Sequence, residues 1–92
     1  MPLVEVIPSQ HTSKETIDKV LELLISCGKT PIVVGDCAGF IVNRILLPYL
    51  NEAAFILSEG SKIEHIDHLI KGFGMPMGPF TLADTVGIDV GY

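Results

Sequence analysis

Residues 36–60 read DCAGFIVNRILLPYLNEAAFILSEG, and this stretch decides the fold. The pattern predicts a turn at its start, a long helix, and a stop at Gly60. At about 100° per residue, the polar side chains form one stripe. Its members are Arg44, Asn51, Glu52, Ser58 and Glu59. Pro48 removes one helix hydrogen bond and is expected to bend the axis. These polar residues and the proline argue against a membrane span.

Asn43 does not belong to the polar stripe, because it aligns with the apolar Leu47, Leu50 and Leu57. A buried carboxamide leaves about 1–3 kcal/mol of desolvation uncompensated unless a hydrogen bond forms. Two interpretations follow. Asn43 caps a backbone group in the core, or it points into a pocket and holds a ligand.

The segment Leu3–Ile7 predicts a β-strand, because β-branched residues dominate it. Both faces are apolar apart from Glu5, as expected for a strand inside a parallel sheet. Glu5 either reaches water from a strand end or a sheet edge, or it orients a basic partner, typically a histidine.

A capping box at Thr12–Glu15, with Thr12 as N-cap and Glu15 reaching back, predicts a helix that ends at Gly28. Pro31–Val34 predicts a second buried strand, so the order is that of one βαβ unit. Two strands leave both edges and one face of a sheet open, which is typical of the tail of a larger α/β domain. The glycines of residues 35–39 lack the spacing of a dinucleotide-binding loop.

The C-terminal third predicts two more helices. An apolar period from Ile63 to Ile70 marks the first, with His65, Asp67 and His68 pointing outward. No third ligand accompanies the two histidines, so we expect no metal site there. Pro79 suits the first turn of the last helix, which Gly87 ends.

Composition excludes some classes of function. The chain has 92 residues, 48% of them apolar, and its mean hydropathy is +0.48. We therefore expect surfaces that further chain or another copy covers. A net charge of −5 with six scattered basic residues argues against nucleic-acid binding. Cys27 and Cys37 are expected to be buried thiols of a reducing compartment.

Three motifs, in order, resemble the 3-hydroxyacyl-CoA dehydrogenases. They are Met1–Ile7; Asp36–Arg44 with Pro48–Ala53 and Gly60; and Gly74–Phe80 with Leu82, Asp84, Gly87 and Asp89. The resemblance covers essentially the whole chain. It implies an α/β part followed by an all-α part: residues 1–36 as the terminal βαβ piece of a Rossmann-type NAD-binding domain, and residues 37–92 as the first helices of the family's helical C-terminal domain.

The resemblance also implies an activity. The family oxidises (S)-3-hydroxyacyl-CoA to 3-oxoacyl-CoA with NAD in fatty-acid β-oxidation. Glu5 falls on the family's catalytic glutamate, which orients the histidine that takes the hydroxyl proton, and Asn43 falls on its substrate-binding asparagine. The family places that histidine and its NAD-binding glycine loop upstream of this strand. His11, His65 and His68 therefore inherit no role, and we expect an inactive fragment when the chain is isolated.

Expected partners follow from the same resemblance. The sequence around Met1–Glu5 and Leu82–Asp84 is more similar to the multifunctional α subunit of the fatty acid oxidation complex than to the single-function enzyme. That α subunit binds a thiolase subunit. We expect an acyl-CoA substrate and a cytoplasmic location. We also expect a homodimer, one form of which is a domain-swapped dimer that exchanges segments through the Gly35–Gly39 hinge. Two alternatives stay open: a helical association module, and a related dehydrogenase for 3-hydroxybutyryl-CoA or a sugar acid.

Overall fold

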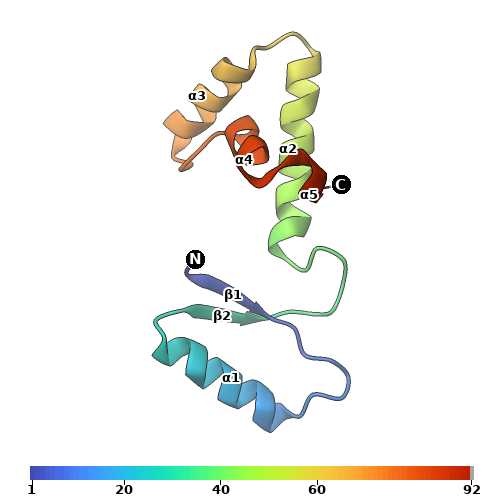
Figure 1. Ribbon diagram of the computed structural model, residues 1–92, viewed down its shortest axis with the longest axis vertical. Helices are drawn as coiled ribbons and strands as arrows, with labels where there is room; N and C mark the ends of the chain where they lie inside the picture. The colour runs from blue at the N-terminus through green and yellow to red at the C-terminus, as the bar shows by residue number, and fades with distance from the viewer. Residues whose placement is uncertain (92) are drawn as a thin grey trace. The chain divides into compact units, whose positions relative to one another are not determined.

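The computed structural model describes residues 1–91, and the predicted fold class is confirmed (Figure 1). A two-stranded parallel sheet with one helix is followed by four helices. The chain divides into two compact units, Met1–Arg44 and the residues from Ile45 onward.

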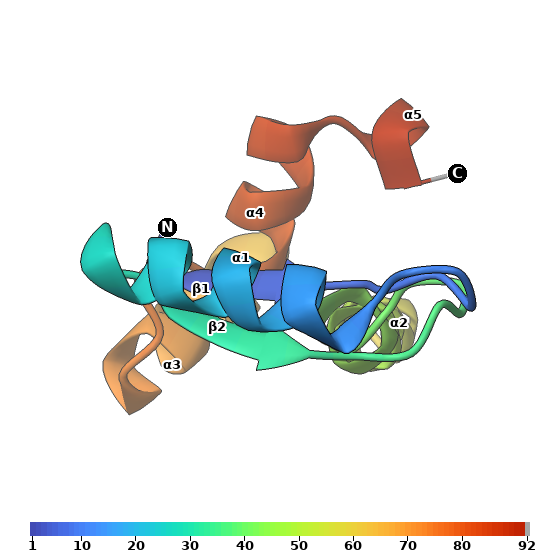
Figure 2. The ribbon, with the colours of Figure 1, turned by 90° about the horizontal axis from the view of Figure 1, so that it is seen from below.

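The first unit is a βαβ unit, as the sequence predicts. Strand β1 (Leu3–Val6) pairs in parallel with β2 (Thr30–Val33), and helix α1 (Lys14–Ser26) connects them. Figure 2 shows α1 lying over both strands. Val34, directly after β2, is buried. The helix thus covers one face of the sheet.

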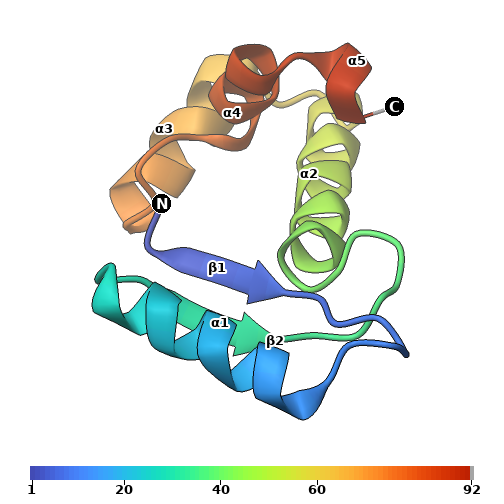
Figure 3. The same cartoon turned by 60° about the horizontal axis from the view of Figure 1, so that its bottom comes forward.

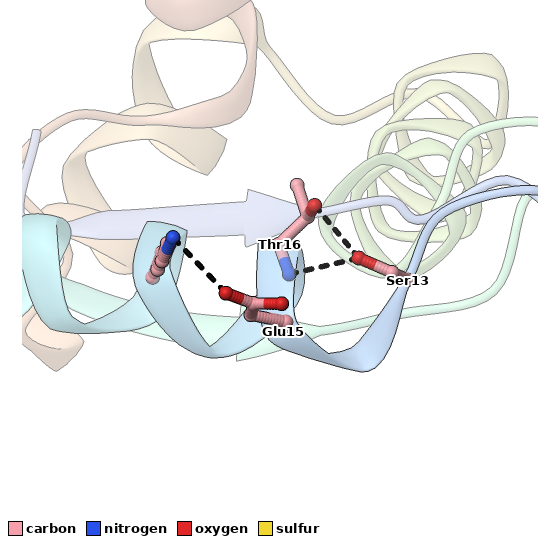
Figure 4. A network of polar contacts seen from close by, with 4 residues as sticks. Ser13, Glu15 and Thr16 are labelled. Carbon is pink, nitrogen blue, oxygen red and sulfur yellow. Dashed lines mark hydrogen bonds and ion pairs between the residues drawn. The ribbon is translucent and has the colours of Figure 1, made fainter.

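Helix α1 begins one residue later than the capping box predicts. Ser13, not Thr12, is the N-cap: its Oγ accepts the N–H of Thr16 at 3.1 Å (Figure 4). The hydroxyl of Thr12 instead accepts the N–H of Ser9 at 3.0 Å, so it stabilises the turn before the helix. Glu15 does not reach back but pairs with Lys19 one turn ahead, at 3.2 Å.

The prediction of buried cysteines is wrong. Cys27 and Cys37 are both free and exposed. Cys27 is the C-cap of α1, where the chain leaves the helix, and Cys37 lies in the turn that follows β2.

The second unit consists of helices α2 (Val42–Ser58, which starts in the first unit), α3 (Ile63–Phe73), α4 (Pro79–Val86) and α5 (Ile88–Gly91). Three of the predicted helix ends are confirmed. Gly60 follows α2 with φ 109°, Pro79 begins α4, and Gly87 ends it with φ 97°. The short helix α5 was not predicted.

The core of the second unit is small. Ala53, Ile66 and Pro79 are buried, and α3 and α4 lie side by side (Figure 3). Many apolar side chains are exposed to solvent: Ile45 is 69% and Phe73 is 86% exposed. Within residues 1–91, none of the helices has both the length and the apolar character needed to cross a bilayer.

Candidate functional site

The turn before α2 has an unusual backbone. The N–H of Phe40 donates to the carbonyl of Cys37 at 3.0 Å, Gly39 has φ 78°, and Phe40 has φ 49°. A positive φ is uncommon for a bulky residue such as phenylalanine. Successive N–H groups in such turns form concavities that bind anions.

Glu5 supplies the anion to this turn. Its Oε1 accepts the N–H of Ile41 and the N–H of Val42, each at 2.9 Å. The side chain is half-buried on β1, and Oε2 has no hydrogen-bond partner within residues 1–91. The sequence did not predict this contact. Its only local signals were a carboxylate on an apolar strand and a helix start without a capping side chain, which leaves N–H groups unsatisfied.

Asn43 is the second residue of α2 and directly follows Val42, which donates to Glu5. The structure therefore brings the two predicted site residues to the same helix start. Asn43 is exposed, and no hydrogen bond within the described chain occupies its carboxamide. The interpretation of Asn43 as a core cap is wrong for this reason, while its role as a ligand-binding residue stays a prediction.

Arg44 lies over the same turn. A Cβ added to Gly39 would come within 3.2 Å of its Cγ, and Arg44 Nη1 is 3.6 Å from the Sγ of Cys37. A side chain at position 39 would therefore meet both an unfavourable φ and the stem of Arg44.

The histidines do not join this group of residues. His11 Nε2 contacts the Gln10 side chain at 3.4 Å, while His65 and His68 lie on α3. Within residues 1–91, no histidine is hydrogen-bonded to Glu5, and no set of three His, Cys, Asp or Glu side chains is arranged to hold a metal ion.

A second polar cluster lies in the helical unit, and the sequence pattern did not predict it. Asp67, predicted to point outward, is half-buried and caps α4. Its Oδ1 accepts the N–H of Phe80 at 3.0 Å, and its Oδ2 accepts the N–H of Thr81 at 2.9 Å and its hydroxyl at 2.7 Å. Burial raises the pKa of Asp67, but the bond from the Thr81 hydroxyl and the two amide bonds outweigh it, so the net pKa is lowered.

Tyr49 on α2 adds a buried hydroxyl to this unit. Its oxygen has no hydrogen-bond partner among the described residues. Burial raises the pKa of Tyr49, and the negative charge of Asp67 raises it further. Both causes favour the neutral phenol.

Two family models match the chain. The 3-hydroxyacyl-CoA dehydrogenase C-terminal domain matches residues 39–92, and the NAD binding domain of the same family matches residues 1–37. The chain belongs to the 3-hydroxyacyl-CoA dehydrogenase family.

Relatives of this chain agree with the family assignment. This chain is 60% identical over 91 residues to the fatty acid oxidation complex subunit alpha of Vibrio cholerae. The aligned segment covers 99% of this chain and 13% of that protein. The subunit alpha of Vibrio campbellii is 59% identical over the same length. The chain thus corresponds to a minor part of the curated relatives it matches.

Solved structures share its fold. The 3-hydroxybutyryl-CoA dehydrogenase of Escherichia coli has a TM-score of 0.90 at 41% identity, covering 98% of this chain and 20% of that one. The (S)-3-hydroxybutyryl-CoA dehydrogenase of Ralstonia eutropha has a TM-score of 0.87 at 46% identity, covering 97% and 32%.

The residues of this chain do not themselves fit the pyrophosphate of NAD. The glycines after β2 lack the dinucleotide-binding spacing, and Glu5 already occupies the amides of Ile41 and Val42. A carboxylate at that point also repels a phosphate. NAD is the cofactor of the family, whose NAD binding domain matches residues 1–37. No step of its chemistry is assigned to the residues of this chain.

Proposed function

We propose that this chain is the junction of an NAD-dependent dehydrogenase that oxidises (S)-3-hydroxyacyl-CoA to 3-oxoacyl-CoA in fatty-acid β-oxidation. In this proposal, residues 1–36 end the NAD-binding domain and residues 37–92 begin the helical C-terminal domain. The two family models, which meet between residues 37 and 39, support that boundary. The observation that carries the proposal is the placement of Glu5 against the helix start that bears Asn43.

The two site residues have different tasks. The Oε2 of Glu5, which has no partner within residues 1–91, is available to accept an N–H from an imidazole base. Such a bond fixes the tautomer of the imidazole and stabilises its protonated form. Asn43 donates its carboxamide N–H to the oxygen on C3 of the substrate and stabilises charge that develops there. When bound to the parent enzyme, NAD would supply the hydride acceptor, and no residue of this chain is assigned to that step.

The isolated chain is proposed to be inactive, because no described histidine is hydrogen-bonded to Glu5 and the residues present do not fit NAD. Formation of NADH from NAD and 3-hydroxybutyryl-CoA by the purified 92-residue chain, above a blank without protein, would contradict this. Contamination is excluded by testing Asn43→Ala from the same host in parallel.

The proposed roles are tested in a hybrid enzyme. The matching 91-residue segment of the Vibrio cholerae subunit alpha is replaced by this chain, and NADH formation from 3-hydroxyacyl-CoA is measured. We expect the hybrid to be active, and Asn43→Ala and Glu5→Gln to lower kcat/KM by about 100-fold or more. Asn51→Ala is the matched control, because Asn51 is an exposed asparagine on the same helix. Near-normal rates for both site variants would remove the assignment.

A multifunctional α subunit is the favoured parent protein, with the thiolase subunit as its partner and the cytoplasm as its location. The 60% identity to the Vibrio cholerae subunit alpha exceeds the 41% and 46% identities to the 3-hydroxybutyryl-CoA dehydrogenases, which support the second candidate. Two free cysteines agree with a reducing compartment. Copurification of the full-length parent protein with a thiolase subunit tests the first candidate, and a parent protein that binds no thiolase favours the second.

Association of two copies is the alternative function. The exposed side chains of Ile45, Phe55 and Phe73 support association, because apolar groups of this size favour burial against a partner. We propose a homodimer, with exchange through Gly35–Gly39 as one route. Light scattering at tens of micromolar checks this, and a monomer at that concentration would contradict it.

A further inference from the structure

We infer that Glu5 is also the positioning residue for Asn43: one carboxylate oxygen holds the start of α2, while the other is left for the base. This inference rests on the proposed function, in which Asn43 contacts the substrate. It assigns to Glu5 a task in substrate binding in addition to its task beside the histidine.

The division between the two oxygens follows from the hydrogen bonds. Both amide donors, Ile41 and Val42, end on Oε1 at 2.9 Å. An ionised acceptor forms stronger bonds to N–H groups than a neutral one. It also lies where the helix dipole favours negative charge. Oε2 takes no part in holding the turn.

The turn depends on this partner from another element. Glycine and apolar residues occupy positions 38–42, so no side-chain oxygen in that segment can cap the helix. Phe40 is held at φ 49°, a conformation that surrounding contacts must maintain. The carboxylate of Glu5, 36 residues before Ile41 in the chain, supplies those contacts.

Asn43 is one residue beyond the second of these bonds. Its backbone position relative to β1 is therefore set by the contact between Glu5 and Val42. A loss of this contact frees the first turn of α2 to fray and moves the carboxamide. Misplacement of a substrate-positioning group by about 1 Å can lower catalysis by about 100-fold.

Substitutions at Glu5 separate the two tasks. Glutamine keeps a neutral oxygen that can accept both N–H groups but loses the charge beside the base. Alanine loses both. If Glu5 acts through the base alone, both variants lower kcat alike and leave KM unchanged. If it also positions Asn43, Glu5→Ala raises KM about tenfold and Glu5→Gln raises it less than threefold.

The kinetic experiment is done in the hybrid enzyme and includes Asn43→Ala. We expect the rise in KM caused by Glu5→Ala to disappear when Asn43 is already alanine, because no carboxamide is left to misplace. Equal KM values for the alanine and glutamine variants, or an undiminished rise in the Asn43→Ala background, would overturn the inference. Glu15→Ala on the exposed face of α1 is the control and should change neither parameter.

An NMR experiment on the 92-residue chain tests the same contact without catalysis. In Glu5→Ala we expect amide exchange at Ile41 and Val42 to rise at least tenfold and the side-chain NH2 signals of Asn43 to shift. Glu5→Gln should change both less than threefold. Unchanged signals in Glu5→Ala would overturn the inference. If Glu5→Ala does not fold, Glu5→Asp, which withdraws the oxygen by one methylene, replaces it with the same expectations.

The two experiments distinguish the possible failures. An inactive wild-type hybrid combined with the expected NMR changes contradicts the proposed function but supports the contact that positions Asn43. An active hybrid with unchanged amides in Glu5→Ala supports the function and overturns the positioning role.

Discussion

Asp67 and Thr81 are joined by two hydrogen bonds, one from the Thr81 N–H at 2.9 Å and one from its hydroxyl at 2.7 Å, both to Oδ2. With the N–H of Phe80 on Oδ1, a carboxylate of α3 satisfies the start of α4. The helical unit is therefore tied together by a side chain 13 residues before the first donor. Helix N-termini are ordinarily capped by the residue directly before them.

Asp67→Asn is expected to lower the free energy of unfolding by about 1–2 kcal/mol at neutral pH, because charged acceptors bind N–H groups more strongly than amides do. The folded pKa of Asp67 is lowered, so its contribution is present above the unfolded pKa of about 3.9 and is lost as the pH falls through the folded value. Denaturant titrations of both proteins from neutral to acidic pH measure this. A difference between wild type and variant that persists below both pKa values would contradict the role of the charge.

Gly78→Ala is expected to destabilise the helical unit by about 1–3 kcal/mol. A Cβ there would overlap the Cα, Cγ and Oδ1 of Asp67, and Gly78 is buried. Gly72→Ala is the matched control: a Cβ at position 72, inside α3, meets nothing within 4 Å. That variant should gain about 0.5–1 kcal/mol from helix propensity. Thermal unfolding followed by circular dichroism compares them, and equal Tm values would contradict the close approach.

Ser13→Ala is expected to lower the free energy of unfolding by about 1 kcal/mol, because it removes the acceptor of the Thr16 N–H. Glu15→Gln should change it by less than about 0.5 kcal/mol, since Glu15 forms only an exposed ion pair with Lys19. Urea unfolding measures both. The opposite order would restore the capping box that begins at Thr12.

Tyr49→Phe is expected to raise the free energy of unfolding by about 1 kcal/mol, because the buried hydroxyl has no partner among the described residues. The pKa of Tyr49 is raised by burial and by Asp67, so the folded state favours the neutral phenol over the phenolate. The difference in stability between wild type and Tyr49→Phe should therefore stay constant below the unfolded pKa of about 10 and widen as the pH rises through the folded pKa. A destabilised Tyr49→Phe would show that the hydroxyl is bonded in solution.

Absorbance titration tests the coupling of Tyr49 to Asp67. In a Tyr92→Phe background only Tyr49 titrates, since the sequence has two tyrosines. Its pKa should lie above about 10 and should fall in Asp67→Asn, where the neighbouring negative charge is gone. An unchanged pKa in that variant would contradict the electrostatic contact.

The sequence by itself determined the types and the order of most elements. β-Branched content marked β1 and β2, apolar periodicity marked α1, α2 and α3, and Pro79 and Gly87 marked the two ends of α4. These signals are local, because backbone propensity and periodic burial depend on residues within a few positions of each other. The motifs that resemble the dehydrogenase family follow the same elements, and the family models match both parts of the chain.

Only the tertiary structure decided the partners of the polar side chains. Glu5 stands out in the sequence as a carboxylate on an apolar strand, but the sequence does not reveal that it accepts the N–H groups of Ile41 and Val42. Apolar periodicity placed Asp67 on the wrong side of α3. Both carboxylates bind amides that are far away in the chain. Periodicity records whether a position is apolar, not which unsatisfied N–H groups another element brings to it. The choice between Ser13 and Thr12 depended likewise on backbone dihedral angles and on the neighbouring turn at Ser9.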